Sequence, residues 1–244
     1  MRLTKARVQG YRSIIDTGYF DVEDRKTILV GPNEAGKTAI LQALQKLNPP
    51  EGVQLFDPLR DYPRARYDED IKNGNIDFKK FTVVEGHFTL EDADKQELPE
   101  AYHSIIYVFG RRLDNTVWHR LDGGPNCLTY GELEKDLQRI CLHFKATSET
   151  QGEQSSVQDA IQSSLESVVS GLTRVSRITA ERSKQISDWL NKYFKYLDED
   201  NEKEEKRYDR ITDLLVRPSE YETVLKKCNA LLPKFILFSN YFRI

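Results

Sequence analysis

The sequence predicts an α/β fold with a mixed, partly antiparallel sheet and a helical insertion. Three observations carry this prediction. Strand-like segments bounded by turns fill the first half, and a glycine-containing loop followed by a helix with one apolar face interrupts them. From Gly131 the apolar residues recur at steps of three and four. We therefore expect a lobe formed by residues 1–130 and 232–244, and a helical subdomain over residues 131–231.

In the lobe, the apolar positions Ile40, Leu44 and Leu47 share one helical face, and Asn48-Pro49-Pro50 ends that helix because proline cannot continue the hydrogen-bond ladder. Residues 51–79 are rich in Pro, Asp, Arg and Gly, which indicates a long surface loop. Segments with apolar, β-branched and aromatic residues are expected as strands. They are Leu3–Gln9, Tyr19–Val22, Thr27–Val30, Phe81–Leu90, Ser104–Phe109, Thr116–Leu121 and Phe235–Phe238.

The subdomain is expected to be a set of amphipathic helices. Its apolar faces run from Leu133 to Phe144, from Val157 to Val175, from Ile186 to Leu197 and from Tyr221 to Cys228. The polar stretch Ala146–Ser156 separates the first two, and the mixed-sign run Asp198–Arg210 indicates a solvated helix end and linker.

Composition gives few functional constraints. A formal net charge of -3 provides no overall attraction to nucleic acid or to an anionic membrane. The longest apolar runs are strand-sized, so no membrane partner is expected, and the N-terminus lacks the apolar core of a secretory signal, which predicts a cytoplasmic protein. Three scattered cysteines without a CxxC pair make a disulfide framework or a zinc site an unfavourable interpretation.

One motif carries strong chemistry. Gly31 to Thr38 match the pattern GxxxxGK[ST], between a predicted strand and a predicted helix. Its glycines let successive N–H groups turn toward phosphate oxygens, and the helix N-terminus adds its positive dipole end. We expect Lys37 to reach the β- and γ-phosphates in a catalytic role and Thr38 to bind Mg²⁺. The predicted phosphate contacts are Gly31, Pro32, Asn33, Glu34, Ala35, Gly36, Lys37, Thr38 and Ala39.

Residues around this loop resemble a known group of proteins. The loop carries Asn33 and Glu34, is preceded by Gly10-Tyr11-Arg12-Ser13-Ile14 and is followed by Ile40-Leu41-Gln42-Ala43-Leu44. It resembles the ABC-type ATPase heads of the RecF, SMC and OLD (overcoming lysogenisation defect) group. RecF and SMC heads usually have Gly in place of Glu34, so the resemblance favours the OLD-like AAA ATPases. Asp61-Tyr62-Pro63-Arg64 and Phe235-Ile236-Leu237-Phe238-Ser239 are similar to that subgroup as well.

The resemblance implies a P-loop NTPase fold that uses ATP and Mg²⁺. It also implies heads that dimerise when ATP binds, as a homodimer or larger homo-oligomer, and that control DNA processing or phage defence through a nuclease or another effector. In such heads an Arg-Ser after the first strand lies near the nucleotide, so Arg12 is a candidate contact, its alternative being a surface arginine at a strand end. Asn240 occupies the place of the glutamine that contacts Mg²⁺ and the attacking water; no Gln is present there.

Two parts of such a site are missing from the sequence: the signature motif and a Walker B strand ending in Asp-Glu. The nearest imitation is Tyr196-Leu197-Asp198-Glu199, but Lys195 interrupts the apolar run, so a helix end is the favoured interpretation. We expect the chain to bind ATP and to hydrolyse it weakly or not at all unless a C-terminal half or a partner chain completes the site.

Alternative functions stay open. A nucleotide-gated interaction module would use ATP binding without needing hydrolysis, and a small-molecule kinase would transfer phosphate unaided. A GTPase is disfavoured because Asn191-Lys192-Tyr193-Phe194 lacks the guanine-reading aspartate. Basic segments at Arg60–Arg66, beside Tyr62 and Tyr67, and at Arg111-Arg112 are compatible with DNA contact, although a charged surface loop is the favoured interpretation. The four histidines show no metal-ligand spacing and are expected to be structural or at the surface.

Overall fold

The computed structural model describes residues 1–32, 35–74, 76–198 and 201–238. It divides the chain into two compact units. The first unit is Met1–Pro125 together with the chain from Leu225 onward, and the second is Asn126–Val224.

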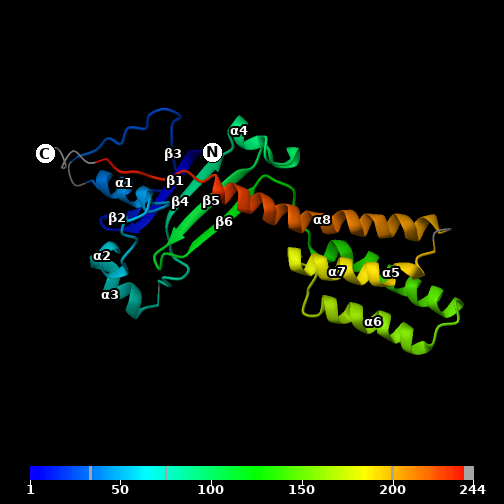
Figure 1. The fold of residues 1–244 in the computed structure, drawn as a ribbon. Coiled ribbons are helices and arrows are strands. Elements are labelled where there is room, and N and C mark those ends of the chain that lie inside the picture. The colour runs from blue at the N-terminus through cyan, green and yellow to red at the C-terminus, as the bar shows by residue number, and fades with distance from the viewer. Residues whose placement is uncertain (33–34, 75, 199–200, 239–244) are drawn as a thin grey trace. The chain divides into compact units, whose positions relative to one another are not determined.

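An antiparallel sheet forms the centre of the first unit (Figure 1), with strand order β2-β1-β4-β5-β6 and β3 paired with β1. The strands are β1 (Arg2–Tyr11), β2 (Ile14–Asp16), β3 (Phe20–Asp21), β4 (Thr82–Thr89), β5 (Ile106–Arg112) and β6 (Val117–Asp122). All pairings among the described residues are antiparallel, with Arg7 opposite Glu85 and Val108 opposite Arg120. The α/β fold class and the predicted hairpin of β5 and β6 are therefore confirmed, whereas the sheet expected to be mixed has only antiparallel pairs among the described residues.

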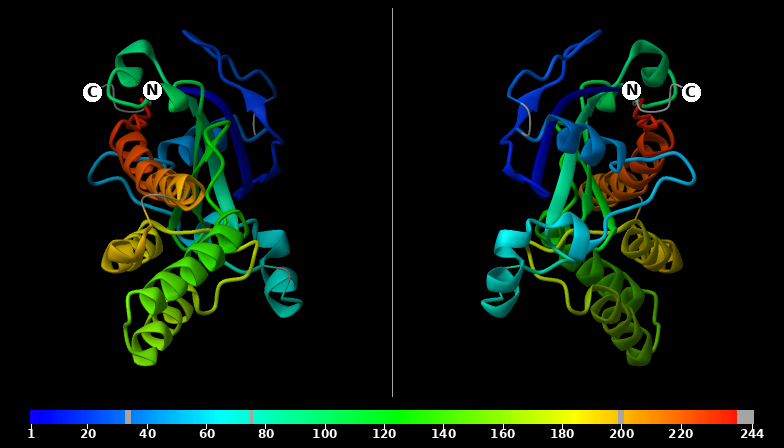
Figure 2. Two further views of the ribbon diagram at one scale, coloured as in Figure 1. Left: turned by 90° about the vertical axis from the view of Figure 1, so that its right-hand side faces the viewer. Right: turned by 90° about the vertical axis from the view of Figure 1, so that its left-hand side faces the viewer.

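Helix α1 (Lys37–Gln45) lies against one face of this sheet in both views of Figure 2. Ala39 and Ala43 are buried on its inner face, and Leu47, two residues beyond the end of the helix, is buried as well. A Cβ added to Gly86 of β4 would lie 2.9 Å from the Leu47 side chain, so only glycine permits this close approach. This packing holds α1, the helix that follows the predicted phosphate loop, against the sheet.

Two predicted strands are absent. Thr27–Val30 and Phe235–Phe238 are described without strand pairing. Val30 and Phe238 are each 89% exposed, although Phe235 donates its N–H to the Asn48 carbonyl at 3.1 Å. Strand propensity reflects packing on a half-buried pleated surface, and no neighbouring strand pairs with either segment within the described part of the chain.

The predicted loop over residues 51–79 contains two helices, α2 (Pro58–Asp61) and α3 (Arg64–Lys72). The first begins where the Asp57 side chain accepts the Leu59 N–H, with Pro58 at the first helical position. Composition indicated a loop because Pro and Asp are turn residues, but the same residues start helices. The short helix α4 (Asp92–Lys95) and the 3-10 turn η1 (Glu100–Tyr102) follow β4.

The second unit is helical, as predicted. It contains α5 (Tyr130–Thr150), α6 (Ser155–Val169), α7 (Ala180–Tyr193), the 3-10 turn η2 (Phe194–Tyr196), and α8 (Glu202–Ala230) as far as Val224. Three of the four predicted apolar faces contribute to one core that includes Leu133, Leu137, Phe144, Ile161 and Trp189. The face Tyr221–Cys228 lies outside this core, Val175 is exposed, and Ile211 joins the core without having been predicted. A capping box formed by Thr129 and Glu132 starts α5.

Two boundaries in this unit differ from prediction. Helix α5 continues to Thr150 through part of the polar stretch, and α8 begins at Glu202 within the charged run, where Lys206 pairs with Glu202 at 2.9 Å. Pairs of opposite charge at i and i+4 stabilise a solvent-exposed helix. The charged run lacks the apolar periodicity by which a helix is predicted from sequence, so this helix start was not expected. Within the described ranges, no helix has both the length and the apolar content to cross a membrane.

Candidate nucleotide-binding site

The predicted phosphate loop leads directly into α1. Gly36 adopts a left-handed backbone with φ of 85° and occupies the N-cap position, and Lys37 is the first residue of the helix. The Lys37 ammonium donates to the carbonyl oxygens of Gly31 and Pro32, each at 2.6 Å. The lysine charge is thus held over the loop by the loop's own backbone.

The N-terminus of α1 is suited to an anion. No acidic residue lies in its first turn and Gly36 offers no side-chain cap, so the first N–H groups are left to other acceptors. A cavity of about 460 Å³ opens there. It is lined by Arg12, Ser13, Gly36, Lys37, Thr38, Ala39 and Gln42.

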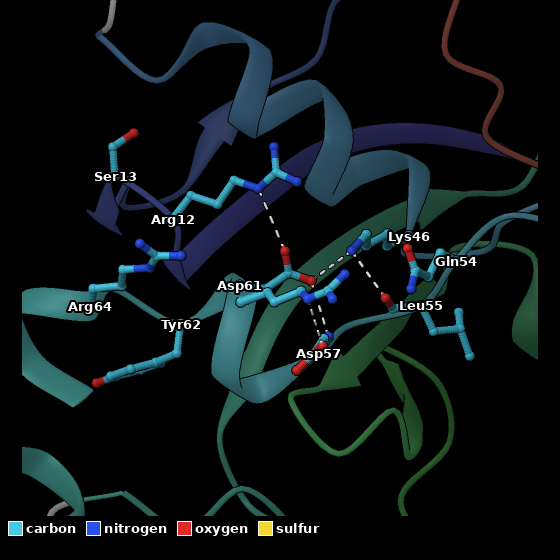
Figure 3. Close-up of a pocket in the computed structure, with 10 residues that line it drawn as sticks. Arg12, Ser13, Lys46, Gln54, Leu55, Asp57, Asp61, Tyr62 and Arg64 are labelled. Atoms are coloured by element: carbon cyan, nitrogen blue, oxygen red, sulfur yellow. Dashed lines mark hydrogen bonds and ion pairs between the residues drawn. The ribbon is translucent and has the colours of Figure 1, made fainter. Parts of the chain in front are cut away.

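A second cavity of about 560 Å³ adjoins the first and shares Arg12 and Ser13 with it (Figure 3). Its other lining residues come from the end of α1 and from the chain around α2: Lys46, Gln54, Leu55, Asp57, Arg60, Asp61, Tyr62 and Arg64. Arg12 therefore stands where the two cavities meet.

A match to a family model agrees with this geometry. The model described as "AAA ATPase domain" matches residues 1–235. The chain belongs to this family. Among curated proteins, no match was found. As an AAA ATPase domain, the chain is of the nucleotide-binding ATPase type, which typically uses Mg²⁺.

Among the described residues of the loop, Gly31, Pro32 and Gly36 to Thr38 are compatible in their arrangement with the nucleotide that this AAA ATPase family implies. The left-handed turn at Gly36 favours glycine, and a Cβ there would approach the Ile14 and Ser13 side chains to 3.3 Å, which is tight. Thr38, the predicted Mg²⁺ ligand, is the second residue of α1. Within the described ranges, no group of three or more His, Cys, Asp or Glu side chains is arranged to hold a metal ion. Asn33, Glu34 and Asn240 lie outside the described residues.

Arg12 is held at the junction of the AAA domain's two cavities. It has a positive φ of 53°, which is uncommon for a residue other than glycine. Its side chain donates to the Gln42 amide oxygen of α1 and pairs with the Asp61 carboxylate, Nε to Oδ1, at 3.5 Å. The guanidinium also lies over the Tyr11 ring, 5.2 Å from its centre.

Sequence reasoning missed the polar residues that surround Arg12. In the sequence, Asp61 belongs only to a motif that resembles OLD-like ATPases, whereas the structure buries it and pairs it with Lys46 at 2.7 Å. Gln42 follows Thr38 by four positions, and this helical spacing was the one available signal for its place beside the loop.

The other candidate residues have structural partners. The Tyr62 hydroxyl donates to Asp70 at 2.6 Å, and Tyr67 stacks on Phe78. Arg111 donates to the carbonyls of Leu47 and Asn115, and its burial lowers its pKa. All four histidines have partners within their own unit: His87 with Glu85, His103 with the Leu98 carbonyl, His119 with Tyr107, and His143 with the Asp198 N–H.

Tyr11 provides a pH-dependent prediction beside the site. Its hydroxyl is buried without a hydrogen-bond partner among the described residues, and burial, with Asp61 nearby, raises the pKa of Tyr11 to about 12 from the usual 10.0. Above pH 10.0 the unfolded chain loses this proton while the folded chain keeps it. The stabilising contribution is thus complete below pH 10.0 and disappears as the pH approaches 12.

We expect Tyr11→Phe to lose less unfolding free energy between pH 10 and pH 12 than the wild type loses. At neutral pH the variant should be at least as stable, because burying an unpaired hydroxyl costs about 1–3 kcal/mol. Urea unfolding across this range measures both effects, with Tyr67→Phe at a partly exposed ring as the control. If wild type and Tyr11→Phe lose the same unfolding free energy between pH 10 and pH 12, the prediction is wrong.

Proposed function

We propose that this chain is the ATP-binding portion of an OLD-like ATPase related to RecF and SMC heads. The observation that carries the proposal is the loop itself, with a left-handed Gly36 and with Lys37 fixed over the loop at the start of α1. The Asn33-Glu34 pair and the Asp61-Tyr62-Pro63-Arg64 motif support the OLD-like assignment.

The nucleotide occupies both cavities. Its phosphates lie at the N-terminus of α1, where backbone N–H groups and Lys37 bind them and the Thr38 hydroxyl holds Mg²⁺. Bound Mg²⁺ neutralises charge on the phosphate oxygens. The nucleoside enters the adjoining cavity of about 560 Å³, whose lining includes Leu55, Gln54 and Tyr62. This path takes the ligand past Arg12.

Hydrolysis requires further polypeptide. The sequence contains no Walker B strand and no signature motif. Four apolar side chains in the two segments without strand pairing are exposed, which supports packing by additional chain; they are Ile28, Val30, Ile236 and Phe238. ATP-dependent association of two heads then controls an effector that acts on DNA or in phage defence. Arg60, Arg64 and Arg66 are exposed and are available to nucleic acid phosphates.

ATP turnover tests this assignment. The chain alone should bind MgATP yet release phosphate at the background rate, because neither the Walker B carboxylates nor the signature motif is present. Adding a polypeptide that carries both elements should raise turnover well above background, and Lys37→Ala in the same mixture should remove the increase. Rapid turnover by the chain alone would contradict the proposal.

The exposed apolar segments also favour a second candidate, a nucleotide-gated interaction module. Under this alternative, ATP binding orders an assembly surface and hydrolysis is unimportant. Sedimentation with and without ATP, combined with the turnover measurement, separates the two. ATP-dependent association with turnover that stays at background after completion favours the module.

A further inference from the structure

We propose that Asp61 is a positioning residue of the nucleotide site, which acts by holding Arg12 in the wall between the two cavities. The inference rests on the proposed nucleotide binding and assigns a role to a residue outside the phosphate loop.

The Asp61 carboxylate is buried and paired with basic side chains. Asp61 is only 4% exposed, and a carboxylate so placed must be paired or hydrogen-bonded. Its Oδ2 accepts from Lys46 at 2.7 Å and from the Asp57 N–H at 3.0 Å, while Oδ1 faces Arg12 Nε at 3.5 Å. Figure 3 shows Asp61 between Arg12 and Lys46.

Asp61 also holds the backbone of Arg12. The Arg12 N–H donates to the Asp61 carbonyl oxygen at 2.6 Å, so one residue holds Arg12 by both its main chain and its side chain. Arg12 needs this support, since a left-handed conformation is unfavourable for a residue with a Cβ and persists only where its surroundings impose it.

The Arg12 guanidinium reaches toward α1. Held at Nε by Asp61, the Arg12 side chain crosses to α1 and donates from Nη1 to Gln42, within the wall of the phosphate-loop cavity. A guanidinium has five N–H donors, and these contacts engage only part of them. The others are available to an anion, and a donor fixed in advance binds with less loss of conformational entropy.

A purely structural role for Asp61, such as anchoring α2, makes a different prediction. It would affect nucleotide binding through the whole segment around α2 and α3, with or without the Arg12 side chain. If Asp61 acts by positioning Arg12, replacing Asp61 should lower MgATP affinity only while the Arg12 side chain is present. A double-mutant cycle measures this dependence.

The experiment compares wild type, Asp61→Asn, Arg12→Ala and the double variant by calorimetric titration with MgATP. We expect Arg12→Ala to weaken binding about tenfold and Asp61→Asn to weaken it by about fivefold. The double variant should bind no more weakly than Arg12→Ala. Equal weakening by Asp61→Asn in both backgrounds, or no weakening in either, would overturn the proposal.

A second aspartate in the same segment, Asp70, provides a control that distinguishes positioning of Arg12 from a general loss of order in the segment. Asp70→Asn removes a carboxylate charge from the same segment and leaves an amide oxygen that can still accept from the Tyr62 hydroxyl. Its MgATP affinity should stay within about twofold of wild type, and affinity reduced as far as in Asp61→Asn would reject the role of Asp61. Thermal unfolding of each variant checks that it is folded. Wild type that fails to bind MgATP would instead reject the proposed function.

Discussion

Replacing Lys37 with alanine is expected to abolish the stabilisation that MgATP gives to the folded chain. A ligand that binds only the folded state at about 100 times its dissociation constant stabilises that state by about 2.7 kcal/mol. Lys37 supplies the positive charge above the loop, where its ammonium contacts Gly31 and Pro32. Without that charge, the phosphates lose their strongest side-chain partner in the proposed site. Thermal unfolding with and without MgATP measures the loss.

The control for this experiment is Lys135→Ala. Lys135 is exposed on α5 in the second unit and has the same charge. This variant should keep the full MgATP-dependent shift in unfolding temperature. A shift that survives in Lys37→Ala, or one that disappears equally in Lys135→Ala, would mean that MgATP binds elsewhere.

Gly36→Ala is expected to weaken MgATP binding by at least about tenfold, or about 1.4 kcal/mol. Its φ of 85° disfavours any side chain, and the new Cβ would approach Ile14 and Ser13 to 3.3 Å. A side chain disfavours the left-handed conformation, and leaving it would turn the N–H groups at the start of α1 away from one phosphate position. Calorimetric titration measures the change.

Gly52→Ala is a matched control for the backbone strain. Gly52 has a φ of 82°, but no atom lies within 4 Å of an added Cβ. Both substitutions should cost about 1–2 kcal/mol of unfolding free energy. Only Gly36→Ala should change nucleotide affinity, and equal affinity losses in the two variants would show that strain alone explains the effect.

Local patterns predicted the elements whose partners are also local. The β5–β6 hairpin, α1 and the apolar faces of the second unit follow from periodicity because neighbouring residues supply most of the packing. The GxxxxGK[ST] spacing predicted a glycine turn followed by a helix from Lys37, and the structure has a left-handed Gly36 directly before that helix. Such features depend on a few adjacent residues, which the sequence displays directly.

Features that depend on distant partners were not predictable in this way. Thr27–Val30 and Phe235–Phe238 have strand-like composition, yet a strand requires a neighbour, and none pairs with them in the described part of the chain. The grouping of Arg12, Lys46 and Asp61 requires the chain around α2 to approach the end of β1. No periodicity or motif reports such an approach, so the residues that hold Arg12 emerged only from the structure.

The most direct test of the account is a crystal structure of this chain with ATP and Mg²⁺. The proposed site requires the β-phosphate at hydrogen-bond distance from backbone N–H groups of residues 36–38, with Lys37 contacting phosphate and the nucleoside in the cavity beyond Arg12. ATP bound with its phosphates away from the N-terminus of α1 would contradict the central claim.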